Sequence, residues 1–193
     1  MPVTEITLAW ELKEKHPELL LGGERNSEKI DGFDFGNSPL EYNKSKVVKK
    51  TIILTTSNGT NALKKAEKAD NVFVASFANC NAIARKLDDF HSNIAIVCAG
   101  TLGTPSLEDT LAAGKLINEL KSINNYTLND YAYLALGSYQ RYQGEILETI
   151  LKSRNGLRLQ ILNKMEDLKY CASENITDII PEYTQNKIWL YPY

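Results

Sequence analysis

The acidic side chains that could do chemistry lie in segments rich in glycine, serine and asparagine. They are Glu24, Asp34 and the neighbouring pair Glu108 and Asp109. Carboxylate oxygens without histidine are a ligand set that suits Mg²⁺. A divalent cation would screen these carboxylates from a phosphorylated substrate, polarise the phosphoryl group and orient water. The four acids are therefore the candidate metal ligands, and Glu24, Asp34 and Asp109 are the candidate catalytic residues.

Neighbouring polar residues are suited to hold the anionic part of such a substrate. Arg25 can pair with an anion in bidentate fashion. The turn Asn58-Gly59-Thr60 precedes a predicted helix, where backbone N–H groups attract anions. The candidate substrate-binding residues are Arg25, Asn37, Ser38, Asn58, Gly59 and Thr60.

Each of these segments also has an explanation that needs no ligand. Ser, Thr, Asn and Gly favour helix starts in general, so the turn at residues 58–60 is equally typical of a cap. Ser106 with Asp109 three residues later fits a capping box, which explains Asp109 but not Glu108 beside it. Asx turns in a solvated loop would explain Asp34 and Asn37.

The residue types exclude several familiar chemistries. His16 and His91 are the only two histidines, so no His-x-x-x-His metal pair exists and a histidine-dependent triad is poorly supplied. The sequence also has no Gly-x-x-x-x-Gly-Lys-Ser/Thr phosphate loop. Because no protein nucleophile is evident, the residues favour attack by a metal-oriented water.

Composition and charge narrow the class of partner. The 193 residues carry 22 Lys plus Arg and 24 Asp plus Glu, a net charge of −2, so nothing favours nucleic acid. The apolar runs are far shorter than the roughly 20 residues that cross a bilayer, and the first residues do not resemble a secretion signal. Three cysteines, an odd and sparse set, indicate reduced thiols in a cytoplasmic protein.

The elements that must position these residues follow from hydrophobic spacing. The length predicts one α/β domain over residues 1–193. Three successive strand–loop–helix units predict a mostly parallel sheet with helices on both faces, and ligands bind at the carboxyl ends of such strands. Residues 154–156 are typical of a turn. Thr4 is predicted to cap the first helix. Cys98 is predicted to be a small core residue at the end of a strand. The predicted helices are 5–15, 61–69, 79–87, 107–120, 131–142, 146–152 and 165–172, and the predicted strands are 19–21, 50–54, 72–76, 94–98 and 187–191.

Several segments resemble, in the same order, the 2-phosphosulfolactate phosphatase family. They are GGERN at 22–26, GFDFGNSP at 32–39, TTSNGT at 55–60, CAG at 98–100 leading to SLED at 106–109, and SRNG at 153–156. The resemblance implies a three-layer αβα sandwich and a Mg²⁺-dependent hydrolase that converts (2R)-2-phospho-3-sulfolactate to 3-sulfolactate and phosphate. In methanogens this step belongs to coenzyme M biosynthesis. Many bacteria with relatives do not make that coenzyme, so the resemblance leaves the cellular substrate open.

The resemblance also implies a departure at the start of the chain. Family members begin with a further strand and helix whose strand ends close to Asp-Val-Leu-Arg-Ala-Thr, whereas this sequence opens at Pro2-Val3-Thr4 without that unit. We therefore expect an exposed sheet edge that invites pairing with another chain, and a homodimer as the default assembly. One alternative function is a non-catalytic or fragmentary anion-binding chain of the same fold. Another is a plain α/β domain whose loops are only caps and turns.

Overall fold

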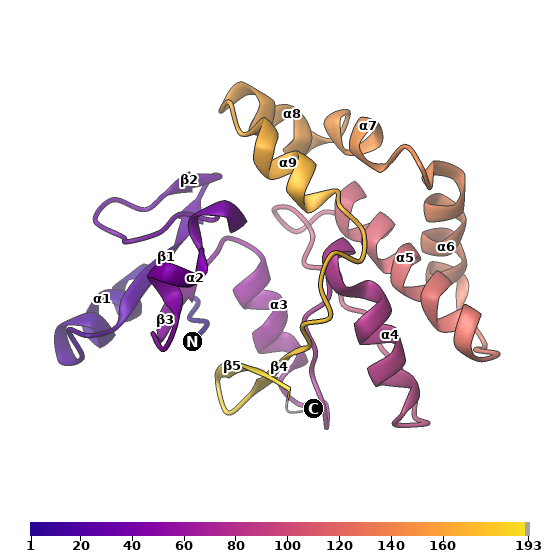
Figure 1. Cartoon of the computed structure of the whole chain (residues 1–193), viewed down its shortest axis with the longest axis horizontal. Helices are drawn as coiled ribbons and strands as arrows, with labels where there is room; N and C mark the ends of the chain where they lie inside the picture. Colours follow the sequence, from indigo (N-terminus) through magenta and orange to yellow (C-terminus); the bar gives the residue numbers. More distant parts are fainter. Residues whose placement is uncertain (192–193) are drawn as a thin grey trace. The chain divides into compact units, whose positions relative to one another are not determined.

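A computed structural model describes residues 1–191 of this chain (Figure 1). Its backbone contacts divide them into two compact units, residues 1–72 with 183–188, and residues 73–182 with those from 189. The mixed α/β class predicted from the sequence is confirmed. The three-layer sandwich around a mostly parallel sheet, the missing first strand–helix unit of the family and the single domain over residues 1–193 stay predictions.

The first unit is built on a three-stranded sheet in the order β2–β1–β3. The pairing of β1 with β3 is parallel, and that of β1 with β2 is antiparallel. The helix α1 packs on the sheet, where Ala9 joins Leu21, Phe33 and Ile53 in one core cluster. The elements are α1 (Ile6–Lys15), β1 (Leu20–Arg25), β2 (Glu28–Lys29), the 3-10 helix η1 (Pro39–Glu41), α2 (Lys44–Val47), β3 (Ile52–Thr55) and α3 (Gly59–Ala66).

The strand β1 is longer than the sequence predicts. The strand predicted at residues 19–21 ends before the glycines at 22 and 23, but in the structure both glycines lie inside β1, which continues to Arg25. A Cβ on Gly23 would come 2.0 Å from the carbonyl oxygen of Thr55, and Gly23 has a φ of +149°. Only glycine lets the two parallel strands approach this closely, so here glycine marks a close contact and not a strand end.

The second unit is mostly helical. Its longest helix, α5, packs against both α4 and α6 (Figure 1). Within residues 1–191, no helix is both long and apolar enough to cross a membrane. The elements of this unit are the 3-10 helix η2 (Phe77–Asn79), α4 (Cys80–Asp88), α5 (Leu107–Ile123), α6 (Asp130–Tyr142), α7 (Ile146–Leu151), α8 (Arg154–Ile161) and α9 (Met165–Cys171). Near the end of the chain come β4 (Pro181–Thr184) and β5 (Lys187–Leu190), where residues 183–188 belong to the first unit.

Two predicted strands do not form, and these predictions are wrong. Residues 72–76 contain a single bridge, between Phe73 and Glu182, and no described residue forms a ladder with residues 94–98. Ile96 and Val97 are 37% and 55% exposed, and Cys98 is exposed instead of lying in the core. A run of apolar residues indicates a preference for a strand. A strand forms, however, only where a neighbouring segment pairs with its backbone N–H and C=O groups.

Two local predictions at helix starts are also wrong. Residues 154–156, predicted as a turn, begin α8, because the Ser153 hydroxyl accepts the Gly156 N–H at 3.0 Å and caps the helix. The first helix has Glu5 in the cap position, without a side-chain cap bond, and not Thr4. Thr4 instead gives its carbonyl oxygen to the Arg25 guanidinium at 3.0 Å.

Candidate functional site

In the first unit, the carboxylate of Glu24 joins the end of β1 to the loop before α3. Glu24 is 7% exposed. Its Oε1 accepts the backbone N–H of Ser57 at 2.7 Å, and its Oε2 accepts that of Ser27 at 2.7 Å. Hydrogen bonds to an ionised acceptor are stronger than neutral ones, so Glu24 fixes the position of this loop. Glu24 and the candidate turn at residues 58–60 therefore lie close together.

The start of α3 is organised by two threonines. Thr60 donates its N–H to Oγ1 of Thr56 at 3.2 Å and its hydroxyl to the Thr56 carbonyl oxygen at 3.0 Å. Asn58, in the cap position, makes no side-chain cap bond. The capping explanation therefore accounts for the threonines, but not for Asn58. The first N–H groups of a helix lack intrahelical acceptors, which leaves the turn around Gly59 suited to an anion.

Arg25 holds the first unit together through three protein acceptors. Its guanidinium donates to Oγ1 of Thr55 at 2.9 Å, to the carbonyl oxygen of Thr4 at 3.0 Å and to that of Glu24 at 2.7 Å. These bonds tie the end of β1 to the end of β3 and to the start of the chain. The predicted bidentate pairing of Arg25 with substrate would compete with them, so the structure favours a positioning role.

Asp34 lies on the opposite edge of β1 from β3, and Asn37 and Ser38 follow it in the chain. Asp34 accepts the N–H of Leu21 at 2.8 Å through Oδ2, beside a bridge between residues 22 and 35. Leu21 precedes Glu24 by three residues, which is about 10 Å along a strand. Asn37 is exposed, and the Ser38 hydroxyl accepts the N–H of Leu40 at 3.3 Å as the cap of η1. Asp34 thus bonds to β1 near its start, whereas the carboxylate of Glu24 lies at its end.

In the second unit, Glu108 links the starts of two helices. Its Oε2 accepts the hydroxyl of Ser106, the cap of α5, at 2.7 Å. Its Oε1 accepts the hydroxyl of Ser153, the cap of α8. The capping box predicted from the sequence leaves Glu108 unexplained, and the partner that explains it lies 45 residues away.

Asp109 faces the loop that leads into α5. Its Oδ2 accepts the N–H of Gly100 at 2.6 Å. Burial raises the pKa of Asp109, and the nearby carboxylate of Glu108 raises it further, although bonds from Gly100, Ser106 and Ala99 oppose the shift. A partly buried acid beside a second acid is a place where a bound cation would be stabilised.

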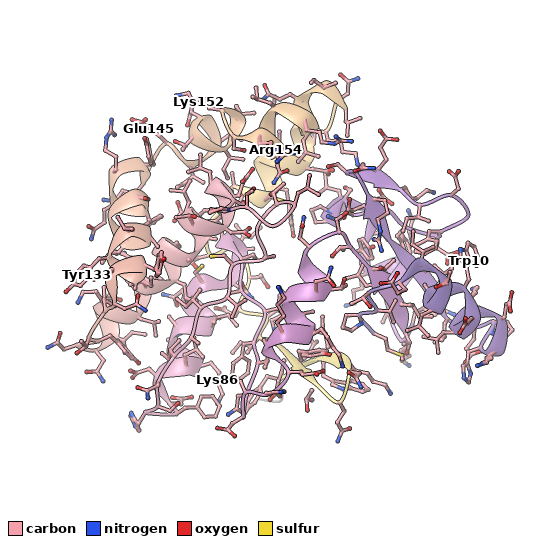
Figure 2. All side chains as sticks on the ribbon, turned by 180° about the vertical axis from the view of Figure 1, so that it is seen from behind. Trp10, Lys86, Tyr133, Glu145, Lys152 and Arg154 are labelled. Carbon is pink, nitrogen blue, oxygen red and sulfur yellow. The ribbon has the colours of Figure 1, made fainter. Side chains whose placement is uncertain are left out.

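Sequence reasoning did not place Asn155 at this site. Asn155 donates from Nδ2 to the hydroxyl of Thr101 at 2.8 Å. Arg154 begins α8 and is exposed (Figure 2). The Ser-x-x-Gly spacing of a capped helix start at residues 153–156 is the local signal that could have indicated this arrangement.

The carboxylates form no preformed metal cage. Among residues 1–191, no three His, Cys, Asp or Glu side chains are grouped so that they could hold a metal ion. Mg²⁺ often binds through only one or two carboxylates and takes its other ligands from water and substrate phosphate. The adjacent pair Glu108 and Asp109 has oxygen donors of that kind, so its chemistry fits this ion.

Comparisons with known proteins agree with one another. The family model described as 2-phosphosulpholactate phosphatase matches residues 1–186. A protein of Caldanaerobacter subterraneus subsp. tengcongensis is 40% identical over 184 residues, which cover 94% of this chain and 76% of that protein. One of Clostridium perfringens (strain SM101 / Type A) is 41% identical over 192 residues (97% and 77%), and one of Symbiobacterium thermophilum is 35% identical over 193 residues (98% and 83%). Each of the three is named "Probable 2-phosphosulfolactate phosphatase".

Proposed function

Because this chain belongs to the 2-phosphosulfolactate phosphatase family, we propose that it hydrolyses 2-phospho-3-sulfolactate to 3-sulfolactate and phosphate. The observation that carries the proposal is the family match over residues 1–186, a range that includes every candidate site residue. In this reaction water attacks phosphorus, the ester P–O bond breaks, and the alcohol oxygen leaves with a proton. A role in coenzyme M biosynthesis and a cytoplasmic location stay predictions from the sequence.

We assign oxyanion binding to the start of α3 in the first unit. Glu24 supports this assignment as a positioning residue, because it fixes the Ser57 N–H and with it the turn around Gly59. Backbone N–H groups at a helix start favour phosphate and sulfonate oxygens. Arg25 contributes by fixing β1 to β3, since three protein acceptors engage its guanidinium.

We also propose that the protein uses Mg²⁺, held in the second unit by Asp109 and Glu108. Oxygen donors suit this ion, and the raised pKa of Asp109 supports a site where added positive charge is favourable. When bound, Mg²⁺ supplies neutralisation of phosphoryl charge and orientation of water. Asp109 holds the loop before α5 in place by accepting the N–H of Gly100. Glu108 holds the start of α8 by accepting the hydroxyl of Ser153.

Phosphate release by the whole chain tests the proposal. With 2-phospho-3-sulfolactate and Mg²⁺, we expect turnover that EDTA abolishes and Mg²⁺ restores. Asp34→Asn, at an acid predicted from the sequence to be catalytic, and Asp109→Asn, at a proposed Mg²⁺ ligand, should each lower kcat/KM about 100-fold, roughly 2.7 kcal/mol of transition-state stabilisation. Asp34→Asn keeps a carbonyl oxygen for the N–H of Leu21, so folding should be preserved, and Asp109→Asn keeps one for the N–H of Gly100.

Two exposed acids provide matched controls. Asp31 precedes Asp34 by three residues, and Glu148 lies on α7 in the second unit; the control variants are Asp31→Asn and Glu148→Gln. Neither should change turnover by more than about twofold, since surface substitutions away from a site have little effect. Unchanged kcat/KM in both test variants would reject the assigned residues, even if the wild type is active.

The non-catalytic alternative predicts a different outcome. It requires binding of phosphate or 3-sulfolactate, measured by calorimetry, without phosphate release under any metal condition. The relatives that match 94–98% of this chain are named as probable phosphatases, which favours an enzyme over a domain that only binds anions. Absence of turnover together with measurable anion binding would select the alternative.

A further inference from the structure

The helix α6 packs on α5 through one face and leaves its other face uncovered. Ala135, Leu136 and Tyr139 are the buried residues of α6. On the other side, Tyr133 is 61% exposed and Leu134 is 67% exposed. Figure 2 shows Tyr133 on the outer side of the helix. Two neighbouring large side chains, Tyr133 and Leu134, are thus exposed together, and contiguous exposed apolar surface marks interaction sites.

The centre of this exposed face is a row of four residues. At 3.6 residues per turn, Asp130, Leu134, Gly137 and Arg141 fall within an arc of about 60°. All four are exposed. The row begins with an acid at the first residue of α6 and ends with a base in its last turn. Within the described part of the chain, neither charge belongs to an ion pair.

This row is complementary to a reversed copy of itself. The two outer residues, Asp130 and Arg141, lie at equal distances along the sequence from the midpoint between Ala135 and Leu136. The two inner residues, Leu134 and Gly137, also lie at equal distances from that midpoint. A second α6 laid antiparallel across a twofold axis at that midpoint would face Asp130 with the partner's Arg141. It would also face Leu134 with the partner's Gly137. A Cβ built on Gly137 has no atom within 4 Å, so the backbone there leaves space for a leucine.

We propose that α6 is the surface through which two copies of this chain associate, with the helices antiparallel about a twofold axis. Opposite charges pair at both ends of the contact, leucine fills the space above glycine near its centre, and the helix dipoles oppose each other favourably. A membrane surface fits the face poorly, because it carries one arginine and one aspartate and no lysine.

The size of the contact sets the expected strength. The helix has 13 residues, so it is about 20 Å long. One helix on each side covers less than the standard interface of about 1,600 Å². We therefore expect a reversible dimer whose population rises with protein concentration.

Charge reversal tests both the surface and its orientation. Sedimentation velocity over a concentration series should show a monomer–dimer equilibrium for the wild type. Asp130→Arg or Arg141→Asp alone places like charges opposite each other twice per dimer and should raise the dissociation constant at least 10-fold. The double variant D130R/R141D should restore association to within about threefold, because only the antiparallel arrangement lets the exchanged charges meet again.

The controls separate association from folding. Glu148→Arg reverses an exposed charge on α7 and should leave the dimer unchanged. Leu134→Asp should abolish association while the thermal melting of the monomer stays within a few degrees of wild type, since Leu134 is exposed. A wild type that stays monomeric at all concentrations, single reversals without effect, or a double variant that stays as weak as the singles would each overturn the proposal.

Discussion

At the scale of single residues, the candidate acids act first as acceptors for their own chain. Glu24 takes two backbone N–H groups, one on each oxygen, whereas Asp34 takes the N–H of Leu21 at the distance given above. An acid with one N–H partner can be replaced by its amide, which keeps a carbonyl oxygen. An acid with two partners, one on each oxygen, cannot. The same conservative substitution therefore tests chemistry at one position and stability at another.

Glu24→Gln is predicted to destabilise the first unit. The new amide has one carbonyl oxygen for two N–H donors, so the N–H of Ser27 or Ser57 must face an NH₂ group. Leaving a buried donor without an acceptor costs about 1–3 kcal/mol. Urea unfolding followed by circular dichroism would measure this loss. Asp34→Asn is the control and should cost less than about 0.5 kcal/mol; equal losses in the two variants would contradict this account.

At the scale of elements, the pair α5 and α6 depends on a glycine that the sequence pattern does not single out. A Cβ on Gly114 of α5 would come 2.1 Å from the carbonyl oxygen of Ala135 on α6. The backbones of the two helices therefore approach each other closely at this point. Gly137 of α6, in contrast, faces open space. Two glycines in adjacent helices thus have opposite roles.

The same substitution at these two positions should change stability in opposite directions. Gly114→Ala gains helix propensity but forces the helices apart, at a cost of about 1–3 kcal/mol for overpacking. Gly137→Ala meets no atom and should gain up to about 1 kcal/mol from propensity. Chemical denaturation of both variants, at a protein concentration where the chain is monomeric, would measure the difference. If both variants are stabilised, the close approach of α5 and α6 is wrong.

At the scale of the whole molecule, a buried ionic network joins distant parts of the second unit. Lys115 is 8% exposed, and its Nζ lies 2.7 Å from Glu119 Oε1 and 3.0 Å from Glu174 Oε2. The Tyr139 hydroxyl donates to Glu174 at 2.8 Å. Burial lowers the pKa of Lys115, but the bonds to Glu119, Glu174 and Tyr139 outweigh it and leave that pKa raised. The network therefore connects α5, α6 and the segment after α9.

The second unit is predicted to lose stability in acid through Glu119. Burial raises the pKa of Glu119, but hydrogen bonds from Lys115, Asn175 and Asn81 outweigh it, so the pKa falls below its ordinary value of 4.5. A carboxyl with a lowered folded pKa stabilises the fold above its unfolded pKa, and this contribution is lost as the pH falls through the folded pKa. Wild type should therefore exceed Glu119→Gln by roughly 3 kcal/mol at neutral pH, the scale of a broken buried pair.

The pH series distinguishes this linkage from a packing effect. The stability difference between wild type and Glu119→Gln should shrink as the pH falls below the ordinary pKa of 4.5 and through the lowered pKa of folded Glu119. Glu166→Gln is the control, because Glu166 pairs with Lys169 at an exposed position and should contribute little at any pH. A difference that stays constant over the whole range would show that Glu119 acts through packing alone.

The sequence by itself determined the elements whose evidence is local. The helices α1, α5 and α6 and the strands β1 and β3 were predicted because hydrophobic spacing and β-branched runs express a preference within a few residues. The family was also predicted, since ordered short segments identify it and residues 1–186 match its model. The roles of the candidate residues stay predictions.

Only the tertiary structure decided what depends on a partner far along the chain. Residues 94–98 have the composition of a strand, but no described segment pairs with them. Glu108 accepts a hydroxyl from Ser153, which is 45 residues further along the chain. Gly23 and Gly114 were required by the approach of Thr55 and Ala135. Backbone pairing, buried hydrogen bonds and close contacts are properties of two segments at once, so no single segment encodes them.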